Sequence, residues 1–328
     1  MSAISNLVEF FFGKEMSKIS KTQENLVKFT NSVQNFWPAK KFYINNSITI
    51  KIINGFRCVV FAPLKADKSI KPHKIIYLHG GAFVMEITSF HWEQINEIAN
   101  KTNSIVYVPI YPLSNNFYSS QEDCIKMFVD LYKILLKEDS DSEYQLMGDS
   151  AGGFFALILA GQVNKLNLKK FENLFLNSPL ISFDENEKPD NVKDPVLNYQ
   201  LAMIIKQWQT SIQTPENAEL FNVYANDFSP SEKIYIFNGE REYLLKQTKV
   251  LTTYLEKVGI TYSAFVEPNM FHDYIIFTFL KQSRKGNQFI IDILNGVDQN
   301  KKTKKPVKKE RVKKSSPKQK VKKTKQTE

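Results

Sequence analysis

A serine flanked by glycines lies in this sequence where a short apolar segment passes directly into a longer one. The pentapeptide Gly148-Asp149-Ser150-Ala151-Gly152 follows residues 143–147, a segment of strand length, and precedes the apolar residues 153–160, a segment of helix length. A sharp strand-to-helix turn holds its central residue in a strained backbone conformation with the side chain presented outward. The glycines leave room where side chains would clash. The segment therefore predicts a strand-turn-helix unit that presents the hydroxyl of Ser150.

From residue 74 onward, segments typical of strands alternate with segments typical of helices. This alternation predicts a mostly parallel central sheet with helices on both faces. Upstream, the Asn54-Gly55 dipeptide predicts the turn of a hairpin. The expected strands are residues 43–53, 56–62, 74–78, 104–110, 143–147, 173–178, 233–237 and 261–266, and the expected helices are residues 90–102, 119–138, 151–163, 242–257 and 273–294.

Three further segments are expected to lie outside this alternating core. Residues 1–40 have the apolar spacing of amphipathic helices and are predicted to be N-terminal cap helices. A polar stretch and an apolar helix over 197–208 interrupt the alternation, so residues 184–225 are predicted to be a cap insertion. The catalytic domain is then expected to span residues 41–298, followed by a tail over 299–328.

The expected strand at 74–78 ends in a segment poor in side chains, His79-Gly80-Gly81-Ala82-Phe83. Such a segment lets backbone amides approach a carbonyl oxygen closely, as an oxyanion hole requires. The N–H groups of Gly81, Ala82 and Ala151 are the candidates for this role. A simple turn would show the same glycines. His79, Gly80 and Asp149 are assigned supporting roles, and His79 is expected to brace the loop.

A serine nucleophile requires a general base, and the chain contains four histidines, His73, His79, His91 and His272. His272 is the one that follows Ser150 in the chain, and it lies in a loop after an expected strand. His73 and His91 are expected at the ordinary surface. We therefore predict His272 as the base, although a histidine before an apolar helix commonly serves as a cap or packing residue.

The base in turn needs a carboxylate to orient it. Glu240 and Glu242 both follow the expected strand at 233–237. Each fits by position, and the physical argument alone does not choose between them.

Together, HGGAF, GDSAGG, a post-strand G-x-x-E and a late Phe-His resemble the hormone-sensitive-lipase-like branch of the α/β-hydrolase superfamily, in particular its small bacterial carboxylesterases. The resemblance covers roughly residues 40–295. It implies the α/β-hydrolase fold with a helical cap, and it implies a catalytic triad of Ser150, Glu242 and His272. Most members of that branch carry aspartate as the acid, a third glycine at the position of Ala82, and an aspartate-tyrosine-arginine stretch where this chain has residues 108–113.

The excess positive charge of the chain is concentrated in its last 28 residues. The whole chain carries a net charge of +10, but residues 301–328 hold thirteen lysines and Arg311 against two glutamates, a net of +12, which leaves −2 for the first 300 residues. A block of this composition is expected to be disordered. It is expected either to contact anionic membrane or nucleic acid without specificity or to act as a solubilising appendage.

Two cysteines, Cys58 and Cys124, lack metal-ligand spacing and are expected to be buried thiols in a reducing compartment. With no apolar run of transmembrane length and no signal peptide, a cytoplasmic location is expected, with the tail allowing peripheral membrane contact.

The residues and the resemblance together predict a serine hydrolase that cleaves small-molecule carboxylic esters, with short to medium acyl chains, through an acyl-enzyme and without a metal or an organic cofactor. Two other interpretations stay open. One is an amidase, peptidase or lipase of the same fold. The other is an inactive hydrolase-fold protein whose basic tail binds anionic membrane or nucleic acid. The sequence does not indicate an oligomeric state.

Overall fold

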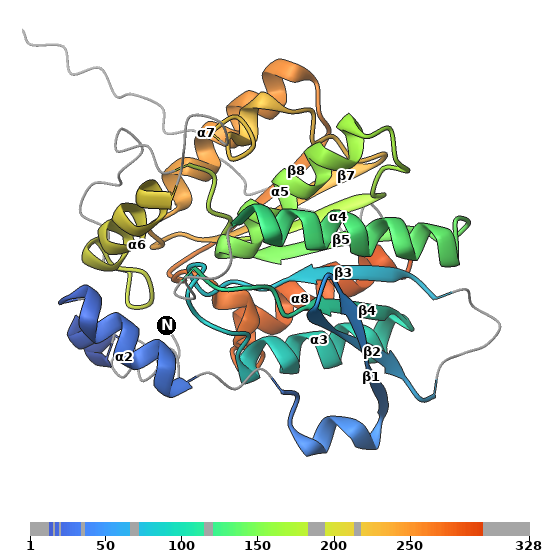
Figure 1. Cartoon of the computed structure of the whole chain (residues 1–328), viewed down its shortest axis with the longest axis horizontal. Helices are drawn as coiled ribbons and strands as arrows, with labels where there is room; N and C mark the ends of the chain where they lie inside the picture. Colours follow the sequence, from blue (N-terminus) through green and yellow to red (C-terminus); the bar gives the residue numbers. More distant parts are fainter. Residues whose placement is uncertain are drawn as a thin grey trace, which may run out of the picture.

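The computed structural model of the chain describes residues 13–15, 17–19, 21–33, 37–65, 72–114, 121–182, 194–212 and 218–297. Its strands form one eight-stranded sheet in the order β1-β2-β4-β3-β5-β6-β7-β8 (Figure 1). The strands are β1 Asn46–Ile53, β2 Phe56–Pro63, β3 Lys74–Leu78, β4 Ile105–Pro109, β5 Tyr144–Asp149, β6 Asn173–Asn177, β7 Lys233–Gly239 and β8 Tyr262–Glu267. The pairs β1–β2 and β2–β4 are antiparallel and the other five are parallel, so the predicted mostly parallel sheet is confirmed.

The helices cover both faces of this sheet (Figure 1). The α-helices are α2 Gln23–Val33, α3 Ser89–Thr102, α4 Gln121–Glu138, α5 Ser150–Lys165, α6 Tyr199–Ile212, α7 Leu245–Val258 and α8 Lys281–Leu294, and short 3-10 helices occupy η1 Lys40–Ile44, η3 Val223–Ala225 and η4 Tyr274–Ile276.

Alternation of side chains along the strands divides the core into two layers, because successive residues of a strand point to opposite faces. In β3, Ile76 and Leu78 join an apolar cluster with residues of α4, α5 and α7, whereas Ile75 and Tyr77 join a second cluster with residues of α3 and α8. All residues of β3, β5 and β6 are buried. The centre of the sheet is therefore fully buried beneath the loops that follow the carboxyl ends of these strands.

The hairpin at the start of the sheet forms at the predicted turn. Asn54 and Gly55 both have positive φ, 53° and 84°, as a two-residue hairpin turn requires. The first strand starts at Asn46 rather than at residue 43, because residues 40–44 form the 3-10 helix η1 with Phe42 buried beneath it.

The helix expected over residues 273–294 is wrong in its first part. The chain forms only the single turn η4 and then starts α8 at Lys281. The side chains of Ser283 and Asn287 both donate to the carbonyl oxygen of Ile275, at 2.5 and 2.9 Å. These bonds satisfy a carbonyl that a continuous helix would have paired with a backbone amide.

The cap segments are described only in part. Residues 1–12, 183–193 and 213–217 and the tail beyond residue 297 lie outside the described residues. Leu26 of α2 and Leu201 and Ile205 of α6 belong to the same buried cluster as α4 and α5, and Figure 1 draws α2 and α6 at one side of the sheet. The predicted division into cap, catalytic domain and tail stays a prediction.

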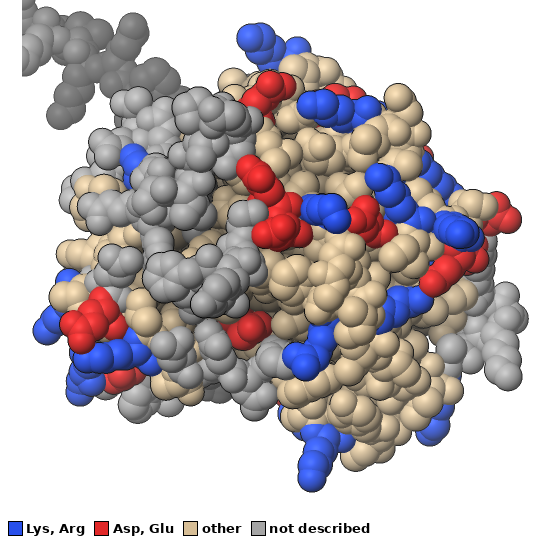
Figure 2. All heavy atoms as spheres, viewed as in Figure 1, with Lys and Arg blue, Asp and Glu red and all other residues tan. Residues whose placement is uncertain are grey.

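The charges of the described residues are mixed in sign. Figure 2 shows Lys and Arg side chains interspersed with Asp and Glu over one face of the molecule. Within the described part of the chain, no helix combines the length and the apolar character needed to span a bilayer. Cys58 and Cys124 are free and buried, which confirms the expectation of two buried thiols.

Candidate active site

The turn between β5 and α5 holds Ser150 in a backbone conformation that an L-residue rarely adopts. Its φ is 51°, and α5 starts at this residue. A side chain on Gly152 would overlap the carbonyl oxygen of Leu78, and one on Gly148 would overlap the carbonyl oxygen of Gly152. The glycines are therefore needed for helix α5 to pack against the ends of two strands. The serine retains 8% exposure, so only a small part of it faces solvent.

His272 lies directly beside this serine. The loop after β8 places its Nε2 atom 2.8 Å from the Oγ atom of Ser150, across 122 residues of sequence. His272 is 3% exposed. When Nε2 carries no proton, the hydroxyl of Ser150 donates to it, which is the arrangement that a general base needs before it accepts the serine proton.

The two candidate acids occupy different environments. Glu242 is 1% exposed, and its Oε2 atom accepts hydrogen bonds from the Ser178 hydroxyl at 2.6 Å and the Gly239 amide at 2.8 Å. Burial raises the pKa of Glu242 to about 7, against the lowering effect of nearby His272. Glu240 is exposed and accepts a hydrogen bond from the Asn269 amide. Of the two, the structure brings Glu242 into the buried surroundings of His272.

Three carboxyl groups surround the imidazole of His272. Burial disfavours its charged form, but Asp273, Asp194 and Glu242 outweigh that effect and raise the pKa of His272 to about 10. Asp194 is buried and accepts hydrogen bonds from backbone amides, among them that of Tyr243 at 3.0 Å. Within the described residues, the Nδ1 atom of His272 has no hydrogen-bond partner. Glu242 and Asp194 therefore act on this imidazole through their charge, whereas Asp273 also lies within reach of the Nε2 atom, at 3.2 Å.

The loop after β3 is strained and tightly folded. Gly81, Ala82 and Phe83 all have positive φ, at 118°, 56° and 64°. The carbonyl oxygen of Gly81 accepts hydrogen bonds from the amides of Val84 and Met85, at 3.0 and 2.8 Å. Ala82 thus adopts a conformation that favours glycine. This loop and the amide of Ala151 are the predicted oxyanion hole, which stays a prediction.

His79 is enclosed at the start of that loop. Its ring stacks on Tyr111 with centroids 4.3 Å apart, and the hydroxyl of Tyr111 donates to the His79 carbonyl oxygen at 2.7 Å. The Nδ1 atom lies 2.6 Å from the carbonyl oxygen of Gly80. Burial lowers the pKa of His79 to about 4, so the ring is neutral near pH 7. These contacts brace the loop.

Asp149 connects the serine turn to the same loop. Its carboxylate accepts hydrogen bonds from the Tyr77 hydroxyl and the Gly80 amide, both at 2.8 Å, and lies 3.0 Å from the Nε2 atom of His91. A side chain on Gly80 would overlap this carboxylate. Although burial opposes ionisation, His91 and Tyr77 hold the pKa of Asp149 below its usual value.

The expectation that His91 lies at the ordinary surface is wrong. His91 is 4% exposed, because α3 turns it inward toward Asp149. Its Nδ1 atom accepts a hydrogen bond from the Thr88 amide at 3.1 Å, which caps α3. Thr88 and His91 have the spacing of a capping box, which marks the start of α3 but does not report which side chains are buried. His73, by contrast, has a partly exposed side chain.

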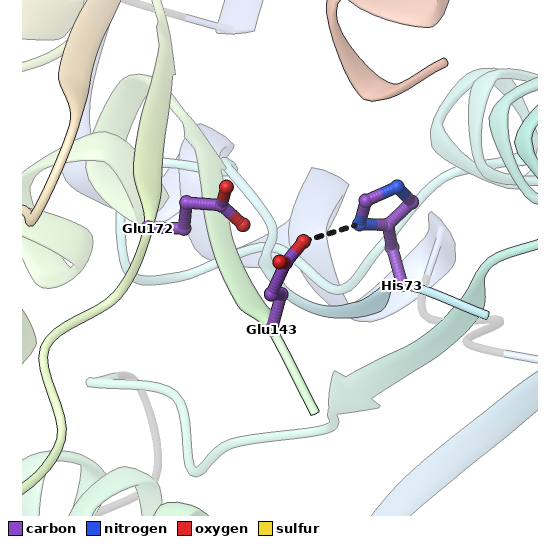
Figure 3. A group of neighbouring side chains, drawn as sticks. All are labelled: His73, Glu143 and Glu172. Carbon is purple, nitrogen blue, oxygen red and sulfur yellow. Dashed lines mark ion pairs between the residues drawn. The ribbon is translucent and has the colours of Figure 1, made fainter. Parts of the chain in front are cut away.

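A group of possible metal ligands lies at the amino-terminal ends of the parallel strands, opposite the ends that carry the loops around Ser150. His73, Glu143 and Glu172 precede the first residues of β3, β5 and β6, and their ligand atoms lie within 4.8 Å of one another (Figure 3). His73 Nδ1 and Glu143 Oε2 are 3.7 Å apart. Glu172 accepts a hydrogen bond from Gln145 at 2.7 Å. These contacts give each side chain a protein partner, and the group is remote from Ser150.

A family model with the description alpha/beta hydrolase fold matches residues 75–276. The match spans the loop after β3, the serine turn and His272. The chain belongs to the α/β-hydrolase fold family. The predicted superfamily and the predicted fold are therefore confirmed.

Curated relatives of this α/β hydrolase carry lipase and esterase names. A triacylglycerol lipase of Mycobacterium tuberculosis is 24% identical over 204 residues, which cover 62% of this chain and 42% of that protein. The carboxylesterase/phospholipase LipF of the same organism is 30% identical over 146 residues, covering 44% and 38%. The chain spans about two fifths of the length of the curated relatives it matches.

Solved structures match over nearly the whole chain. An esterase from the bacterial hormone-sensitive lipase family has a TM-score of 0.75 at 19% identity, covering 91% of this chain and 99% of that one. A hyperthermophilic esterase from Pyrobaculum calidifontis has a TM-score of 0.71 at 15% identity, covering 90% and 98%. At these identities, the likeness is one of fold.

Proposed function

We propose that this α/β hydrolase cleaves carboxylic esters through a covalent acyl-enzyme formed on Ser150. The observation that carries the proposal is the 2.8 Å contact between Ser150 Oγ and His272 Nε2 at the start of α5. A serine beside an imidazole, on a strained turn next to a glycine loop, is the arrangement of a serine nucleophile and its base. The esterase and lipase names of the relatives support the same class of reaction.

The proposed reaction starts with transfer of the Ser150 proton to His272 Nε2 while Oγ attacks the ester carbonyl carbon. The negative charge on the carbonyl oxygen is held by the amides of Gly81, Ala82 and Ala151, and the N-terminus of α5 favours the same charge. The imidazolium then donates its proton to the leaving alcohol. A water molecule, activated by His272, releases the acid and restores Ser150.

Glu242 is the proposed acid of this triad. It is the buried one of the two candidates, and its negative charge stabilises the imidazolium that forms during both halves of the reaction. Its hydrogen bonds to Ser178 and Gly239 fix the position of its carboxylate after β7. Asp194, buried beside the imidazole, adds to the same field.

The proposed substrates are small esters with short to medium acyl chains. The serine is only slightly exposed, so an acyl chain has to pass the surrounding loops to reach Ser150. A series of p-nitrophenyl esters from acetate to palmitate measures the preferred length. A maximum at four to eight carbons is expected, whereas a maximum at long chains would identify a lipase.

The deciding experiment compares the wild type with Ser150→Ala and with Ser140→Ala, an exposed serine that serves as the matched control. Ser150→Ala is expected to lower kcat on a short ester by about 10⁴ to 10⁶ and to abolish labelling by a fluorophosphonate. Ser140→Ala is expected to keep both. A wild type that neither turns over the ester nor takes up the label would favour an inactive binding protein.

A further inference from the structure

A second carboxylate contacts the nitrogen of His272 that faces the serine. Asp273 follows His272 in the chain, and its Oδ2 atom lies 3.2 Å from His272 Nε2. The Oγ atom of Ser150 lies 2.8 Å from the same nitrogen. A proton on Nε2 can therefore bond either a hydroxyl or a carboxylate, and the carboxylate is the stronger acceptor.

The position of Asp273 is built into the fold. The residue is 7% exposed, and its backbone amide donates to the Ser178 hydroxyl at 3.0 Å. The same hydroxyl donates to Glu242 at 2.6 Å. Ser178 therefore fixes both Asp273 and Glu242 relative to His272.

An aspartate at position 273 lowers the stability of the folded state in two ways. Its φ is 56°, in the left-handed region that favours glycine. Its Oδ1 atom is buried with no hydrogen-bond partner among the described residues. A strained backbone and an unpaired buried oxygen both oppose folding, and a glycine would avoid both. The contact with His272 and, more weakly, the charge of His91 are the interactions that favour a carboxylate here.

We propose that Asp273 is a second carboxylate partner of His272, which accepts a hydrogen bond from Nε2–H and so stabilises the imidazolium on the side that faces Ser150. The proposal rests on the proposed role of His272 as the general base. Glu242 remains the acid that stabilises the imidazolium from its own position after β7.

The contact between Asp273 and His272 opposes the start of the reaction but favours the imidazolium that forms during it. Before the reaction, an imidazolium bonded to Asp273 has no lone pair on Nε2 and does not accept the serine proton. The enzyme therefore becomes active only when His272 loses this proton. Once Ser150 has transferred its proton, the same carboxylate stabilises the imidazolium that results. Asp273 thus sets the pH at which the reaction starts.

The ionisable groups around Asp273 and His272 also favour the charged form of the imidazole. His272 faces Glu242 after β7 and Asp194 before α6, besides Asp273 itself, and together they raise its pKa. Asp273 lies within the field of Asp149 at the end of β5 and of His91 on α3. Burial raises the pKa of Asp273 to about 6, while His272 lowers it. Each member of the pair therefore favours the charged form of the other.

The test uses Asp273→Asn, which keeps the shape and removes the charge, and Asp273→Gly, which suits the positive φ. The pKa of the His272 imidazole is measured by NMR in full-length protein that carries Ser150→Ala, with His272→Gln to assign the signal. Both variants are expected to lower that pKa by about 1 to 2 units. Glu240→Gln, which removes an exposed carboxylate, is the control and is expected to leave it unchanged.

In protein with an intact Ser150, the acid limb of the kcat/KM profile is expected to move to lower pH in both Asp273 variants. The shift should equal the change in the His272 pKa measured by NMR. An unchanged His272 pKa in a folded variant overturns the proposal, even where activity falls, because a purely structural role would leave the titration in place. The titration needs no ester. If the wild type hydrolyses no ester and the NMR shift is still observed, the proposed function fails and the Asp273 proposal stands.

Discussion

Asp149 accepts a hydrogen bond from the backbone amide of Gly80 at 2.8 Å, so the residue before Ser150 holds the first glycine of the loop after β3. His91 and Tyr77 bind the same carboxylate from α3 and β3. Three segments are thereby tied to one buried side chain. The serine turn and the predicted oxyanion loop are consequently fixed relative to each other before a substrate arrives.

Asp149→Ala is expected to damage both stability and activity. It leaves His91 and the Gly80 amide buried without their partner, which costs on the order of 3–5 kcal/mol of unfolding free energy. The loop also loses its anchor, so kcat on a short ester is expected to fall by about 10²-fold. Urea unfolding and ester turnover measure the two effects. Asp141→Ala, at an exposed aspartate, is the control, and equal behaviour of the two variants would contradict the anchoring role.

Glu242→Gln is expected to lower kcat far more than Glu240→Gln. The first removes a buried negative charge beside the imidazolium of His272, whereas the second removes an exposed carboxylate that binds only the Asn269 amide among its described contacts. The expected loss for Glu242→Gln is about 10²- to 10⁴-fold, because Asp194 and Asp273 retain part of the stabilising field. Steady-state kinetics measured over a range of pH, and compared at the plateau of each profile, gives this loss. The reverse ranking would move the acid to Glu240.

Glu86 is expected to make stability depend on pH. Burial raises the pKa of Glu86 to about 7 in the folded state, above its ordinary value of 4.5. The folded state therefore binds the proton more tightly, so this stabilisation is present below pH 4.5 and is lost as the pH rises through 7. Glu86→Gln, which stays neutral, is expected to gain up to about 3 kcal/mol over the wild type at pH 8 and nearly nothing at pH 4. Urea unfolding at both pH values tests this, and an equal difference at the two values would contradict the assignment.

Deleting residues 300–328 is expected to leave the hydrolysis of a small ester nearly unchanged. These residues contain no candidate catalytic group, and they carry the excess positive charge of the chain. Binding to phosphatidylserine vesicles or to nucleic acid is expected to disappear in the truncated protein. In the full chain it is expected to weaken steeply between 50 and 200 mM salt, because it depends on counterion release and screened attraction. Loss of esterase activity in the truncated protein would show that the tail contributes to the fold.

The serine turn and the hairpin turn could be predicted because their signals are local. Gly148 and Gly152 lie within the turn they permit, and Asn54-Gly55 forms its own hairpin turn. The alternation of strand and helix then determines a parallel sheet, since each crossover returns the chain in the same direction. His272 could be singled out because one histidine follows Ser150.

Other features of the site depend on contacts between distant residues and give no local signal. His91 is buried because it meets Asp149, which lies 58 residues further along the chain. Asp194 joins the surroundings of His272 from the loop before α6. The late start of α8 follows from the bonds of Ser283 and Asn287 to one carbonyl. Sequence periodicity does not report such pairings.

The sheet divides the proposed catalytic groups between its centre and its edge. Ser150 follows β5, whose residues are all buried, whereas His272 follows β8, the last strand of the sheet, where Val266 is 47% exposed. An outer strand opens more readily than a central one. On gradual warming, the two partners should therefore separate while the core helices remain formed. Hydrolysis would then cease several degrees below the temperature at which circular dichroism records melting, and it would return on cooling.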